Sequence, residues 1–173
     1  MSTTIEKILH ELESRGRVPF TPLYIVSEEI LKDNIDAMNR AFFSRFDRFI
    51  LGYSYKTNYA KDVLRMVHQE GGYAEVVSPM ELAHARTFVD DSKIIYNGVI
   101  RDVVGKVELA AHGGIVNVEN LTELRDLDAH ADLMGLDIQV GIRVNLRLSG
   151  AEFSRFGIEV NTNTLEELSS LKH

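Results

Sequence analysis

Apolar and polar positions along the chain follow two alternating rhythms, one typical of helices and one typical of strands. In the segment 3–16 an apolar residue recurs at every third or fourth position, which predicts an amphipathic helix. A second helix of the same period is predicted from Ser27, a typical N-cap residue, to position 42. Between them the stretch TPLYIV, residues 21–26, is predicted to be a short strand.

From residue 49 onward, strand-like and helix-like segments alternate regularly. The predicted strands are 49–56, 73–77, 93–97, 114–118 and 138–145, and the predicted helices between them are 60–70, 79–88, 103–111 and 121–134. Gly71, Gly113 and Gly135 fall where a helix must turn back toward the next strand. This order predicts a parallel sheet covered by helices. Since no glycine-rich nucleotide loop follows any strand, a barrel is favoured over a doubly wound sheet.

Composition narrows the classes of partner and site. The chain has 173 residues, of which 45% are apolar and 26% charged, a formal charge of −7 and no cysteine. Disulfides, thiolate metal sites and a cysteine nucleophile are therefore excluded, and the histidines are too scattered to predict a metal site. No basic stripe predicts nucleic-acid binding, and no apolar run is long enough for a membrane span or a secretory signal. We therefore expect a cytoplasmic protein that binds a small molecule.

Polar side chains stand at the carboxyl ends of the predicted strands, namely Lys56, Glu75, Asn97 and Arg143. In a parallel α/β barrel these ends gather into one concave site. A lysine amine at this position can form a Schiff base with a carbonyl substrate or with pyridoxal phosphate. The structural alternative is a lysine that pairs with a carboxylate or reaches solvent. Spacing alone leaves both interpretations open.

Five stretches, in order, resemble motifs of one enzyme family. YSYKTN, AEVVSPMEL, IIYNGVIRD, VNVENLTEL, and GIRVN followed by SRFGIE are similar to successive motifs of the pyridoxal-phosphate-dependent amino acid decarboxylases, which include diaminopimelate, ornithine and arginine decarboxylases. The resemblance implies an α/β fold, an incomplete parallel (β/α)8 TIM-type barrel of the alanine-racemase-like kind with about five of its eight strands. It divides the chain into an N-terminal helix, residues 1–20, and an amino-terminal barrel portion, residues 21–173.

The resemblance also implies roles for individual residues. Lys56 is the residue expected to hold pyridoxal phosphate as an internal aldimine and to act in catalysis. The implied cofactor-binding residues are Lys56, Glu75, Ser78, Glu81 and Arg143. Glu75 stands where the family has an aspartate. Ser78 and Glu81 are equally explained by a capping box at a helix start, and Arg143 by an ion pair with Glu75 or Glu81.

The implied function is that of the amino-terminal barrel portion of an amino acid decarboxylase, nearest to the diaminopimelate type, with the chain alone inactive. Two alternatives remain, a non-catalytic relative that serves as an interaction module and an amino acid racemase of the same superfamily. Arg155, in place of a family lysine, belongs to a loop interpreted as a substrate-side or packing element.

In the family the remaining strands, the phosphate loop and a β-domain lie later in the sequence, so the chain is expected to be truncated. Because the strand 21–26 pairs with that β-domain in the family, it is expected to be loose or re-paired here. We expect about ten inward apolar side chains to lack cover. A homodimer or other homo-oligomer is therefore expected to cover the open sheet.

Overall fold

The computed structural model describes residues 4–17, 22, 24–145 and 156–171. Its helices are α1 (Thr4–Ser14), α2 (Glu28–Phe43), α3 (Lys61–Gln69), α4 (Pro79–Ala85), α5 (Val103–Ala111), α6 (Leu121–Met134) and α7 (Thr162–Leu168), with a short 3-10 turn η1 (Asp91–Lys93). Its strands are β1 (Gly52–Ser54), β2 (Tyr73–Val76), β3 (Ile94–Tyr96), β4 (Ile115–Val118), β5 (Gly141–Ile142), β6 (Val144–Asn145) and β7 (Ile158–Glu159).

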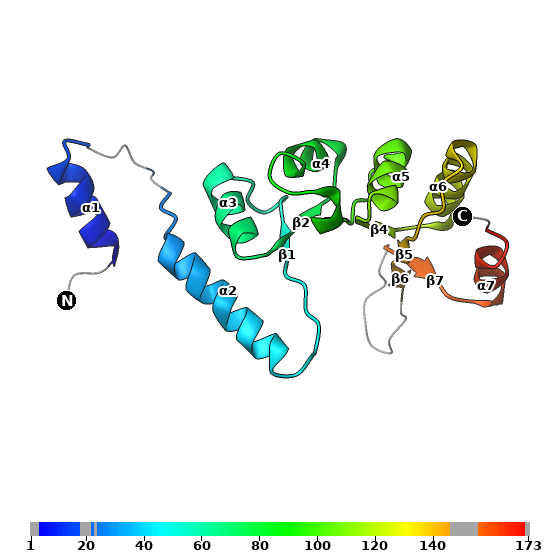
Figure 1. Cartoon of the computed structure of the whole chain (residues 1–173), viewed down its shortest axis with the longest axis horizontal. Helices are drawn as coiled ribbons and strands as arrows, with labels where there is room; N and C mark the ends of the chain where they lie inside the picture. Colours follow the sequence, from blue (N-terminus) through cyan, green and yellow to red (C-terminus); the bar gives the residue numbers. More distant parts are fainter. Residues whose placement is uncertain (1–3, 18–21, 23, 146–155, 172–173) are drawn as a thin grey trace.

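The main sheet is parallel throughout and has the order β1-β2-β3-β4-β5. Ser54 pairs with Glu75 between β1 and β2, and Tyr96 pairs with Val116 between β3 and β4. A second sheet joins β6 to β7, also in parallel. Figure 1 shows α3, α4, α5 and α6 in a row along one side of these strands. The predicted arrangement of parallel strands and covering helices, an incomplete barrel, is confirmed.

Local signals explain where the helices begin and end. The Ser27 hydroxyl accepts a hydrogen bond from the Ile30 amide at 3.3 Å, as an N-cap does. Gly71, Gly113 and Gly135 all have positive φ angles, which glycine adopts without a steric cost. The bounds predicted for α5 and α6 coincide with those observed.

The core lies between the sheet and its helices. Strand side chains alternate between the two faces, and those that point toward the helices are buried. These buried residues are Tyr55, Ala74, Val76, Ile94, Tyr96, Val116 and Val118. They form one cluster with helix residues that include Leu64, Leu82, Leu109 and Leu127.

The opposite, inner face of the sheet carries fewer apolar side chains than expected, and here one expectation was wrong. On β2, β3 and β4 the residues of this face are Tyr73, Glu75, Ile95, Ile115 and Asn117, all only partly buried or exposed. The described inner face therefore does not carry ten apolar side chains. The expectation assumed strands that are buried on both faces. In the structure every second strand residue belongs to the helix-covered face, and these residues account for most of the apolar character of the strands.

Two of the predicted strands differ from those observed, and the first difference agrees with the expectation that the segment 21–26 is loose here. Residues 24–26 of the predicted strand 21–26 form no strand, and Tyr24 is 94% exposed. Among the described residues no strand lies beyond β1 for this segment to pair with. The predicted strand 138–145 divides into β5, which pairs with β4, and β6, which pairs with β7. The predicted boundary between residues 20 and 21 lies outside the described residues.

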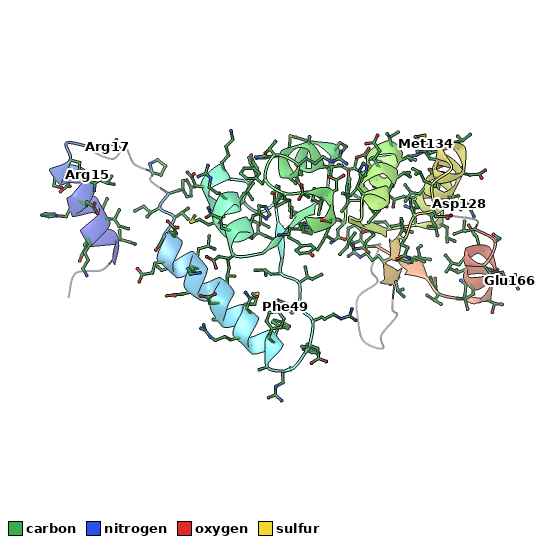
Figure 2. All side chains as sticks on the ribbon, viewed as in Figure 1. Arg15, Arg17, Phe49, Asp128, Met134 and Glu166 are labelled. Atoms are coloured by element: carbon green, nitrogen blue, oxygen red, sulfur yellow. The ribbon has the colours of Figure 1, made fainter. Side chains whose placement is uncertain are left out.

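The helix α2 packs on α3 rather than on the sheet centre. Its buried Ile35 contacts a small cluster with Val63 and Val67 of α3. Phe49, labelled in Figure 2 near the end of α2, stacks on Phe42 with ring centroids 4.3 Å apart. Across the described ranges, no helix combines the length and the apolar character that a membrane span requires.

Candidate functional site

A pocket opens at the carboxyl ends of the five strands of the main sheet. It has a volume of about 450 Å³ and is lined by Lys56, Glu75, Asn97, Asn117, Glu119, Ile142 and Arg143. A volume of this size lies within the usual range for small-molecule sites, roughly 300–1,000 Å³. The pocket brings together all four strand-end residues that the sequence singled out.

Lys56 lies in the turn that directly follows β1. On one side of it the Tyr55 amide donates to the Glu75 carbonyl at 2.9 Å, and on the other the Thr57 amide donates to the Ser54 carbonyl at 3.2 Å. These bonds fix the backbone around Lys56 while its side chain stays exposed. Within the described ranges the ammonium group has no hydrogen bond or ion pair. Of the two structural alternatives, pairing with a carboxylate is therefore not observed there, whereas a side chain that reaches solvent is.

Glu75 belongs to the inner face of β2, next to the segment that carries Lys56. The register that pairs Ser54 with Glu75 places this carboxylate one strand away from the lysine turn. The side chain is half-buried, and in the described part of the chain it has no hydrogen-bond partner. It is a carboxylate available to a ligand in the pocket.

Arg143 follows β5 and is held from two sides. Its Nη1 donates to Glu119 Oε1 at 2.7 Å, and its guanidinium carbon lies 4.8 Å from the centre of the Phe156 ring. The side chain is still half exposed, so other N–H groups remain available. The predicted ion pair with Glu75 or Glu81 was wrong, because β5 neighbours β4, which ends beside Glu119, and not β2.

Ser78 and Glu81 form the capping box of α4. Ser78 Oγ accepts from the Glu81 amide at 3.2 Å, and Glu81 Oε2 accepts from the Val77 amide at 2.9 Å. Neither residue lines the pocket. Their contact with a cofactor stays a prediction, while the structural alternative is observed. Arg155 lies outside the described residues.

Two polar residues of the pocket, Asn117 and Glu119, were not predicted from the sequence. Asn117 Nδ2 donates to Asn97 Oδ1 at 2.5 Å, which joins the ends of β4 and β3. This contact needs a glycine at 141, because a Cβ there would lie 2.0 Å from Asn117 Oδ1. Glu119 is 8% exposed, and among the described residues its Oε2 has no hydrogen-bond partner. Glu119 directly follows β4 and Arg143 directly follows β5, and these two strands are neighbours in the sheet. Their positions along the chain could therefore have identified both as strand-end residues of one site.

Comparisons with known proteins identify relatives of this chain. The profile described as "Pyridoxal-dependent decarboxylase, pyridoxal binding domain" matches residues 32–173. Diaminopimelate decarboxylase of Methanothermobacter thermautotrophicus is 29% identical over 150 residues, which cover 80% of this chain and 34% of that protein. For diaminopimelate decarboxylase of Methanocaldococcus jannaschii the identity is 30% over 160 residues, with coverages of 82% and 36%. The chain thus spans about a third of the length of these relatives.

The fold is likewise shared with solved structures. Diaminopimelate decarboxylase from M. jannaschii in co-complex with L-lysine superimposes with a TM-score of 0.74 at 24% identity, over 95% of this chain and 42% of that one. This likeness identifies the incomplete parallel sheet as part of the alanine-racemase-like barrel. With a profile match over most of its length, the chain belongs to the pyridoxal-dependent decarboxylases, through their pyridoxal-binding domain.

Proposed function

We propose that the chain is the amino-terminal barrel portion of a pyridoxal-phosphate-dependent amino acid decarboxylase, in which Lys56 is the lysine that holds the cofactor. The observation that carries the proposal is the position of Lys56. Its amine is unpaired within the described residues and lines the strand-end pocket of a pyridoxal-binding domain. An unpaired amine is the group that an aldehyde requires.

The residues of the pocket fit this cofactor. Lys56 offers a nucleophilic nitrogen, Arg143 offers N–H donors, and Glu75 offers an acceptor on the neighbouring strand. Bound pyridoxal phosphate would supply an electron sink for the electron pair left when a carboxyl group departs as carbon dioxide.

In the reaction each side chain has a distinct task. Lys56 Nζ holds the cofactor and afterwards carries a proton. Arg143, fixed by Glu119 and Phe156, orients the ligand through the N–H groups that remain. Glu75, on the strand next to the Lys56 turn, accepts a hydrogen bond from the ligand.

Selective labelling of Lys56 tests the proposal. The chain is incubated with pyridoxal phosphate, reduced with borohydride and digested, and the modified peptides are identified by mass spectrometry. We expect the label to concentrate on Lys56 and to disappear in Lys56→Ala. The matched control is Lys61→Ala, which removes another exposed lysine close in sequence and should leave labelling intact. Equal labelling of all exposed lysines would contradict the proposal.

We further propose that the full decarboxylase of which this chain is a portion, here called the parent protein, acts on diaminopimelate. Support comes from relatives named diaminopimelate decarboxylase and from a solved relative in co-complex with L-lysine, the product expected when diaminopimelate loses one carboxyl group. Release of carbon dioxide from diaminopimelate, ornithine and arginine by the parent protein tests this choice. Preference for ornithine or arginine would overturn it. The 173-residue chain alone is expected to be inactive.

We also propose a cytoplasmic protein that self-associates. The strand β1 forms one edge of the main sheet among the described residues, and the end of α2 with the turn after it exposes Phe42, Phe43 and Phe46. An open sheet edge and an exposed aromatic surface favour association with a second copy. Light scattering is expected to give at least the mass of a dimer, and a soluble monomer at working concentration would contradict this.

A further inference from the structure

One buried cation lies behind the pocket. Lys106, in the middle of α5, is 0% exposed. Its Nζ donates to the Gly98 carbonyl at 2.9 Å, pairs with Glu123 Oε1 of α6 and lies 4.8 Å from the centre of the Tyr96 ring. A fully buried lysine is rare unless it is paired, so this arrangement requires an explanation.

The ion pair continues into the pocket through hydrogen bonds. While Glu123 Oε1 contacts Lys106, Glu123 Oε2 accepts from the Glu119 amide at 3.0 Å. The Glu119 side chain in turn accepts from Arg143 Nη1 at 2.7 Å. The contacts of Lys106 with Glu123 and of Glu119 with Arg143 join consecutive βα units, and the bond between Glu123 and the Glu119 amide connects them within one unit. Both oxygens of Glu123 are thus engaged, one in the charge pair and one on the backbone of Glu119.

We propose that Glu123 is a positioning residue, which fixes the backbone of Glu119 and thereby sets the direction in which Arg143 enters the pocket. Lys106 neutralises Glu123 and holds its carboxylate in the orientation that leaves Oε2 for the Glu119 amide. The position of Glu119 matters because its side chain is almost fully buried and has little freedom of its own. The inference deepens the proposed function, since it assigns the support of Arg143 in that site.

A general contribution to stability would be a different role, and two double variants separate the two roles. Lys106→Met/Glu123→Gln removes both buried charges and keeps a side-chain oxygen that can accept from the Glu119 amide. Lys106→Met/Glu123→Leu removes the same charges and that oxygen as well. Because neither variant leaves a buried charge without a partner, both are expected to fold. They differ only in the acceptor for Glu119.

The measurement is the order of the Arg143 side chain, by ¹⁵N relaxation of its Nε–H group in the 173-residue chain. The signal is assigned by its loss in Arg143→Gln. In the unsubstituted chain and the Gln variant we expect the Nε–H group of Arg143 to be about as ordered as that of Arg86, and in the Leu variant we expect an order parameter below about 0.6, in the flexible range. Arg86 is the internal control, because it is held by Asp91 through two hydrogen bonds, of 2.8 and 2.9 Å, outside this network.

Equal order of Arg143 in the two double variants would overturn the inference. A parallel loss of order at Arg86 in the Leu variant would also overturn it, because it would reveal general loosening rather than positioning. The readout contains no cofactor, so it does not depend on Lys56. If Arg143 loses order as expected but pyridoxal phosphate does not label Lys56, the positioning role stands and the proposed function fails.

Discussion

The buried pair of Lys106 and Glu123 makes a sharp prediction about stability. The perturbation is the removal of one charge at a time and then of both, by Lys106→Met, Glu123→Gln and their combination. Lys106 is 0% exposed and the Glu123 side chain 7% exposed, so neither charge can turn to water without opening the contact between α5 and α6. Each single variant therefore leaves one charge buried without its partner.

The expected magnitudes follow from that burial. Breaking a buried pair from one side costs about 3–5 kcal/mol of the free energy of unfolding, whereas replacing both charges with uncharged groups is often nearly neutral. Two independent losses would sum to about 6–10 kcal/mol, which is as large as the whole stability of many domains. We expect the double variant to lie within about 2 kcal/mol of the parent chain and to be more stable than either single variant.

The assay is urea unfolding followed by circular dichroism at neutral pH, with the free energy of unfolding extrapolated linearly to water. As a control, the exposed pair of Arg65 and Asp62 on α3 is treated in the same way, and each of its variants should cost no more than about 1 kcal/mol. Additive losses in the double variant would refute the reasoning, because they would mean that the two side chains act independently.

Three further predictions concern backbone contact and pH. Gly98→Ala would place a Cβ 2.1 Å from the Val77 carbonyl oxygen, so we expect urea unfolding to show a loss above about 3 kcal/mol in the free energy of unfolding. Gly52→Ala is the control and should lose less, because the atom nearest to its Cβ belongs to a flexible side chain. Equal losses in the two variants would contradict this prediction. Burial lowers the pKa of His68, and its protonated ring cannot accept the hydrogen bond from the Tyr55 hydroxyl. Protonation therefore favours the unfolded chain, and the urea midpoint should fall as the pH drops below about 6.5 and fall less in His68→Gln. Burial raises the pKa of Tyr55 to about 12, so its share of stability is complete below pH of about 10 and declines by about 2 kcal/mol toward pH 12. Tyr55→Phe should remove this contribution to the loss of stability between pH of about 10 and 12. An unchanged dependence of the free energy of unfolding on pH in that range would contradict the prediction.

Short-range signals predicted most of the fold, because they act within a few residues. The cap at Ser27 and the positive-φ glycines Gly71, Gly113 and Gly135 act on neighbouring residues only. The helices that begin or end at these residues were predicted to within a few residues. The strand 138–145 was predicted less well. Its division depends on a change of partner from β4 to β7, which only the tertiary structure determines.

The site was predicted in part, for a related reason. Lys56, Glu75, Asn97 and Arg143 were predicted to share one pocket because a parallel barrel gathers its strand ends, a rule that requires only the strand order. Their functional roles stay predictions. The partner of Arg143 was not found, since the rule identifies neighbouring strand ends but does not say which of their side chains form an ion pair. Lys106 was missed altogether. A lysine in a helix is usually exposed, and its burial depends on how two helices pack.

The order of the main sheet repeats the order of the chain, with each strand lying beside the one before it. During synthesis, a strand that leaves the ribosome has its sheet neighbour already synthesised and can pair with it before any later segment appears. The sheet can therefore grow by accretion from β1, and loop closure involves only the short span of one intervening helix. Translation speed, rather than a search among distant segments, would then set the pace at which this part of the barrel acquires its structure.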